Sequence, residues 1–193
     1  YKAKKLPYDF KLDNDLMKLL FQTTEVYGEF KGFLKNMSLD YKFYLENLVI
    51  SDLYYSFKMD GAKLDKQDMF YTPYMIENNT VIEFNNMRKA LLYGASEINK
   101  NEVKIDFFNS LNKILFTNCK KDSKTKGSGK LRKSQNFLLK PGIAGSSVAF
   151  VPPVYSELND LMKNLCSYIN KNDDNDLIAT IITHFQFEKI HPF

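Results

Sequence analysis

The chain has 193 residues, of which 44% are hydrophobic, so it is long enough to bury a core within one or two small lobes. Its net charge of +4 comes from lysine, because Arg88 and Arg132 are its only arginines, and this mild charge argues against a nucleic-acid partner. Cys119 and Cys166 lie far apart without metal-site spacing, and the sequence has neither a long apolar run nor a signal-peptide pattern. We therefore expect a cytoplasmic protein without a membrane partner. The first residue is not Met and the last falls within a motif, so we also expect a piece of a longer protein.

The first 80 residues predict an extended arm and two helices. The arm covers residues 1–11, and apolar residues then recur at helical spacing from Leu12 to about Gly32. A second helical pattern covers residues 39–58 and should stop at Gly61, because glycine commonly ends a helix.

Two further helical patterns follow, over residues 81–98 and 103–116. The lysine-rich segment from 117 to 132 contains Gly127-Ser128-Gly129 and predicts a loop. The helical spacing disappears from 133 to 153, where two apolar stretches flank a segment with proline and glycine. We interpret this region as a β-hairpin.

Two helices are predicted at the end of the chain. Ser156 can cap an amphipathic helix that runs to about Ile169. A polar connection leads to a last helix from Leu177, which is apolar nearly all round and should therefore be buried. The predicted fold is mainly α with one short hairpin.

Both histidines lie in the last ten residues, with Glu188 between His184 and His191, so the three fall on one face of a helix. Pro192 disfavours a helical backbone at the residue before it, so His191 should lie where the helix ends. A metal site is disfavoured because the spacing is not His-Glu-x-x-His and the segment offers no further ligand. The spacing leaves two interpretations: a buried helix whose polar groups bond to backbone, or acid–base catalysis by His191.

The same segment resembles the first half of the signature of Fic-domain proteins: His184-x-Gln186-Phe187-Glu188-x-Ile190-His191-Pro192-Phe193. In that family the signature continues into a Gly-Asn-Gly-Arg loop. In the family a hairpin called the flap precedes the motif. Two segments of this chain resemble it: Gly129-x-x-Arg132-x-x-Gln135-Asn136-Phe137 and Ala149-Phe150-Val151-Pro152-Pro153. The resemblance implies a Fic-type helical bundle over residues 81–193, incomplete at its C-terminal end, and an N-terminal helical extension over residues 1–80.

The resemblance implies a protein adenylyltransferase, which transfers AMP from ATP, with Mg²⁺, to a Ser, Thr or Tyr hydroxyl of a target protein. His191 would be the general base, and Glu188 and Phe193 would lie at the nucleotide site. The flap would dock the target by main-chain pairing, through Gln135, Asn136, Phe137, Val148, Ala149 and Phe150. The phosphate-binding and magnesium-binding parts belong to the other half of the motif. We therefore expect no metal ligand in this chain and no transfer by these 193 residues alone; a homodimer is compatible with the resemblance.

An inhibitory element is implied by Ser56-x-x-x-Asp60-Gly61, which resembles the family pattern of Ser or Thr, three residues, then Glu-Gly. In the family, the glutamate pairs with the second motif arginine and blocks the γ-phosphate position of ATP. Asp60 is one methylene shorter, and its alternative role is simply to end a helix with Gly61. Two rival functions remain: a degenerate Fic-like interaction module, and a Fic enzyme that removes AMP or transfers another nucleotide-derived group.

Overall fold

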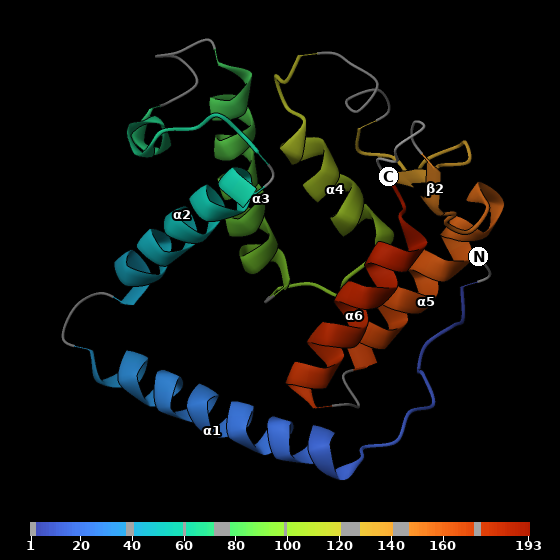
Figure 1. Cartoon of the computed structure of the whole chain (residues 1–193), viewed down its shortest axis with the longest axis horizontal. Coiled ribbons are helices and arrows are strands. Elements are labelled where there is room, and N and C mark those ends of the chain that lie inside the picture. Colours follow the sequence, from blue (N-terminus) through green and yellow to red (C-terminus); the bar gives the residue numbers. More distant parts are fainter. Residues whose placement is uncertain are drawn as a thin grey trace. The chain divides into compact units, whose positions relative to one another are not determined.

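A computed structural model describes residues 3–37, 41–59, 61–71, 78–98, 100–120, 128–140, 147–171 and 175–193. Its regular elements are helices and one antiparallel hairpin, which confirms the predicted mainly α fold (Figure 1). The helices are α1 (Asn14–Asn36), α2 (Tyr41–Met59), α3 (Asn79–Ile98), α4 (Ile105–Leu115), α5 (Leu158–Lys171) and α6 (Asp176–Ile190). The strands are β1 (Leu138–Lys140) and β2 (Ser147–Phe150), and short 3₁₀ turns cover Lys66–Phe70 and Tyr155–Glu157. Among the described helices, none combines the length and the hydropathy that a bilayer crossing requires.

Contacts divide the chain into two compact units. The large unit comprises Tyr1–Tyr8 and Lys89–Phe193, and the small unit comprises Asp9–Arg88, so the division falls within α3. The predicted domain ranges of 1–80 and 81–193 stay predictions.

The core of the large unit forms between α5, α6 and the start of the chain. The amphipathic stripe predicted for α5 is buried, and Figure 1 shows α5 and α6 packed side by side. Leu6 of the N-terminal arm joins this core, and Asn164 of α5 holds it there. The Asn164 side chain accepts a hydrogen bond from the Leu6 N–H (2.7 Å) and donates one to the Leu6 carbonyl oxygen (2.9 Å).

The prediction that α6 is buried all round is wrong. Its buried residues are Ile182, Gln186 and Ile190, which form a single stripe at a spacing of four. Ile181 is 67% exposed and Phe185 is 47% exposed. Apolar residues on every side of a helix cannot indicate which stripe meets the core, and only the stripe facing α5 is enclosed.

The hairpin confirms the strand prediction. β1 and β2 pair antiparallel, with Leu138 opposite Phe150 and Lys140 opposite Ser147, and a bulge lies between Leu138 and Leu139. The residues that connect the strands, 141–146, lie outside the described residues. The hairpin is short, and most of its residues are exposed.

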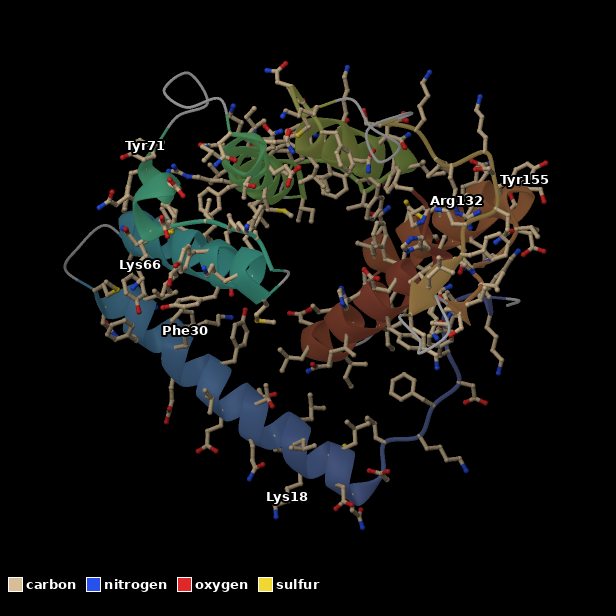
Figure 2. The ribbon with its side chains drawn as sticks, turned by 45° about the horizontal axis from the view of Figure 1, so that its top comes forward. Lys18, Phe30, Lys66, Tyr71, Arg132 and Tyr155 are labelled. Carbon is tan, nitrogen blue, oxygen red and sulfur yellow. The ribbon has the colours of Figure 1, made fainter. Side chains whose placement is uncertain are left out.

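The small unit contains its own core of Leu53, Leu64, Val81 and Phe84. α1 begins later than the predicted Leu12, because the Asp13 side chain caps it by accepting a 2.8 Å hydrogen bond from the Leu16 N–H. None of the residues of α1 is buried; Figure 2 labels Lys18 and Phe30 on this helix.

Candidate functional site

His191 lies immediately after α6, as the following proline predicted. Its backbone is left-handed, with φ 47° and ψ 65°, and its N–H donates a 2.9 Å hydrogen bond to the Phe187 carbonyl oxygen. A left-handed backbone at a residue other than glycine costs on the order of 1 kcal/mol, so surrounding contacts must hold it. This turn directs the chain away from the axis of α6 and leaves the His191 side chain half-buried.

His184 and Glu188 lie on α6 and are both exposed. The stripe that the sequence predicted for His184, Glu188 and His191 is therefore interrupted, because the left-handed turn takes His191 out of the helical repeat. Among the described residues, no three His, Cys, Asp or Glu side chains are grouped closely enough to hold a metal ion.

Arg132, which is labelled in Figure 2, holds the segment that contains His191 through hydrogen bonds. Its Nε donates a 2.8 Å hydrogen bond to the His191 carbonyl oxygen, and its own backbone N–H donates one of 2.9 Å to the Pro192 carbonyl oxygen. The other guanidinium nitrogens donate to the carbonyl oxygens of Ile190 (3.4 Å), Pro153 (2.6 Å) and Ser134 (2.9 Å).

The charge of Arg132 also suits this place, because a cation is favoured beside the partial negative charge of a helix C-terminus. Burial lowers the pKa of Arg132 from its ordinary value. Sequence reasoning assigned Arg132 no role beyond the flap resemblance. The available signal was compositional: only two of the 27 basic residues are arginine, and one of them precedes the hairpin.

Phe193, predicted at the nucleotide site, is half-buried two residues after His191. The centroid of its ring lies 6.4 Å from that of Phe187, which in turn stacks on Phe108 of α4 at 5.3 Å. Asn136 donates a 3.2 Å hydrogen bond from Nδ2 to the Phe193 carbonyl oxygen. The His-Pro-Phe segment is therefore attached to α4 by aromatic packing and to the base of the hairpin by an amide.

The predicted flap residues divide into two groups. The Gln135 side chain donates 3.0 Å hydrogen bonds to the carbonyl oxygens of Pro152 and Asn136, so it closes the base of the hairpin. Phe137 (56% exposed), Val148 and Ala149 face outward, and Phe150 is half-buried with the Lys189 Nζ 4.8 Å from its ring centroid. Outward-facing apolar side chains suit a docking surface, whereas the two amides serve internal contacts.

The predicted inhibitory residues belong to α2 and its end, in the small unit. Ser56 is exposed on α2, and Gly61 has φ 79°, a left-handed conformation that glycine adopts easily. The N–H of Gly61 donates a 3.0 Å hydrogen bond to the Lys58 carbonyl oxygen, so the predicted helix stop is confirmed. Asp60 lies outside the described residues.

The sequence profile of the Fic/DOC family matches residues 102–193. A crystal structure of a Fic family protein from Desulfovibrio desulfuricans G20 matches 100% of this chain and 55% of its own, with a TM-score of 0.60 and 17% identity. The chain therefore spans about half the length of that protein and shares its fold. The curated proteins gave no significant match.

Proposed function

We propose that the longer protein containing this chain is a Fic-type protein adenylyltransferase, because residues 102–193 match the Fic/DOC family profile and the chain shares the fold of a Fic family protein. The reaction transfers AMP from ATP to a hydroxyl of a target protein. The observation that carries this proposal is the placement of His191: it follows the last turn of α6, its backbone is left-handed, and its carbonyl oxygen is held by Arg132.

His191 is the proposed general base. Its imidazole accepts the proton of the target hydroxyl while the hydroxyl oxygen attacks the α-phosphorus of ATP. A bond forms between that oxygen and phosphorus, the bond to the bridging oxygen breaks, and pyrophosphate leaves. Histidine suits this role because its ordinary pKa lies near neutrality.

Glu188 and Phe193 are proposed to border the nucleotide. Glu188 is exposed one helical turn before His191, and Phe193 anchors the segment through Phe187. The described residues offer no cluster of metal ligands. The resemblance assigns the phosphate contacts to the Gly-Asn-Gly-Arg loop, so Mg²⁺ would be held through ATP and that part of the protein, where it would offset phosphate charge.

The hairpin is the proposed docking site for the target. Main-chain pairing to an outer edge of β1 or β2 requires an extended target segment rather than a particular sequence. The exposed Phe137, Val148 and Ala149 would contact side chains of that segment, and Phe150, held near Lys189, would support the strand. For Gln135 and Asn136 the proposed contribution is to fix the hairpin base against the motif.

Autoinhibition by Ser56, Asp60 and Gly61 is a further part of the proposal, and it rests on the resemblance of Ser56-x-x-x-Asp60-Gly61 to the inhibitory pattern of the family. The helix stop at Gly61 is compatible with the alternative role as well. If Asp60 blocks the γ-phosphate position, Asp60→Ala should raise self-labelling with ATP. The exposed Asp52, on the same helix, provides the matched variant Asp52→Ala, which should leave the rate unchanged. Equal rates for both variants and the wild type would assign Asp60 to the helix end alone.

The experiment that tests the function is mass spectrometry of the full-length protein and candidate targets after incubation with ATP and Mg²⁺. We expect the mass increase of one AMP group on a Ser, Thr or Tyr residue. An increase corresponding to another nucleotide-derived group, or loss of AMP from a labelled target, would contradict AMP transfer. The absence of any change would leave the interaction module as the function.

A further inference from the structure

Arg132 connects three segments that are far apart in the sequence. Its guanidinium lies among the carbonyl oxygens of His191 and Ile190 at the end of α6 and that of Pro153 after the hairpin. The Pro192 carbonyl oxygen is bound by the Arg132 backbone. Arg132 therefore binds the carbonyl oxygens of three consecutive residues, Ile190, His191 and Pro192.

The position of Arg132 is itself set from α4. The buried Asn112 accepts a 2.7 Å hydrogen bond at Oδ1 from the Gly129 N–H. Gly129 has φ 80°, and a Cβ there would lie 3.1 Å from the Lys113 Cβ, so glycine permits a close approach to α4. Three residues later, Arg132 reaches the end of α6 from this anchored point.

We propose that Arg132 is a positioning residue that holds His191 in its left-handed backbone and so aims the imidazole. The proposal rests on the proposed function, because it assigns Arg132 a role in the step that His191 would perform. The Nε hydrogen bond fixes the His191 carbonyl, and the backbone bond fixes the next carbonyl. Together they restrict rotation about the bonds on either side of the His191 Cα.

The physical reason is that an extended backbone at His191 would have a lower conformational energy than the left-handed one. A residue before proline prefers an extended backbone, and a left-handed backbone is unfavourable for any residue with a Cβ. Without the Arg132 contacts, His191 should relax toward the extended region and carry its ring with it. A displacement of about 1 Å of a catalytic group can reduce the rate about 100-fold.

Lysine cannot replace this arginine. The planar guanidinium places donors at fixed angles toward several acceptors, whereas an ammonium group is a compact charge on a flexible stem. Arg132→Lys retains the charge and the backbone N–H bond to Pro192 but removes the bond from Nε to His191. This variant therefore separates the effect of the guanidinium geometry from the effect of the positive charge.

The test uses full-length protein with Arg132→Lys, Arg132→Ala and the matched variant Arg88→Lys, whose residue forms an ion pair with Glu46 in the small unit. We measure kcat and KM for AMP transfer, and the ¹³Cα and ¹³Cβ shifts of His191, assigned by their loss in His191→Ala. For Arg132→Lys we expect kcat lower by about 100-fold, KM for ATP unchanged, and His191 shifts moved toward extended values. Arg88→Lys should match the wild type.

Unchanged His191 shifts in Arg132→Lys would overturn the proposal, whether or not kcat falls, because a loss of rate would then have a different origin. Wild-type kcat in Arg132→Lys would overturn it as well. If Arg132→Ala does not fold, the lysine variant still decides. If wild-type protein transfers no AMP, the proposed function fails, whereas the shifts of His191 continue to test whether Arg132 sets its backbone.

Discussion

The Gln186 side chain donates a 2.8 Å hydrogen bond from Nε2 to the carbonyl oxygen of Lys4, across 182 residues of sequence. Gln186 is 0% exposed, and its Oε1 accepts a hydrogen bond from the Tyr8 hydroxyl. The motif helix therefore uses a buried amide to hold the N-terminal arm on both sides of Leu6. Both polar atoms of the Gln186 side chain are therefore used in internal contacts of the large unit.

Replacing Gln186 by Met should destabilise the large unit, because the side chain keeps its approximate volume while the Lys4 carbonyl oxygen and Tyr8 hydroxyl lose a partner. We expect the free energy of unfolding to fall by about 1–3 kcal/mol. Chemical denaturation followed by circular dichroism measures it. The exposed Gln22 on α1 supplies the control Gln22→Met, which should change stability little. Equal stabilities of the two variants would contradict the role of the amide.

Gly129→Ala should destabilise the protein by more than about 1 kcal/mol, because φ is 80° and the added methyl group would approach the Lys113 Cβ. Gly94→Ala, in the same unit, is the matched control: its Cβ would meet Leu111 Cδ2 at an ordinary 3.5 Å, and alanine favours the helix. We therefore expect denaturation experiments to show a lower free energy of unfolding for Gly129→Ala and a higher one for Gly94→Ala. Similar midpoints for both variants would contradict the close approach of Gly129 to α4.

The two free cysteines should react differently with a thiol reagent. Cys166 is buried and Cys119 is half-buried, and burial raises the pKa of the Cys166 thiol above its ordinary value. The thiolate is the reactive form, so Cys166 should react far more slowly than Cys119 near neutral pH. Ellman's reagent should label Cys119 first in native protein and both residues after denaturation; rapid labelling of Cys166 in Cys119→Ser would contradict its burial.

The same pKa shift predicts the sign of a pH effect. The folded state holds the Cys166 proton more tightly than the unfolded state, so this contribution to stability is complete below the unfolded thiol pKa of about 8.5. This contribution is lost as the pH rises through the pKa of Cys166 in the folded state. Cys166→Ala should therefore show a smaller loss of stability between neutral and alkaline pH than the wild type, as measured by urea denaturation.

Local patterns in the sequence predicted much of this fold. The spacing of apolar residues predicted α5, the Pro-Gly segment predicted the hairpin, and Pro192 predicted that α6 ends before His191, because each of these features depends on neighbouring residues. The start of α1 was placed too early, since an apolar Leu12 fits the helical spacing although Asp13 caps the helix.

Contacts between distant residues could not be predicted in the same way. The exposed side of α6 depends on which stripe α5 covers, and the sequence of α6 is apolar on both sides. The bond between Arg132 and His191 spans 59 residues, and no spacing rule links them. The left-handed backbone of His191 likewise reflects contacts made after folding, because Pro192 by itself favours an extended conformation.

The catalytic assignment of His191 is tested most directly by His191→Ala in the full-length protein, with the exposed His184→Ala on the same helix as matched control. AMP transfer from ATP to the target and ATP binding by calorimetry are measured for both. We predict that His191→Ala lowers the transfer rate by about 100- to 10,000-fold while ATP affinity is retained, and that His184→Ala behaves as the wild type. Wild-type transfer by His191→Ala would contradict the account.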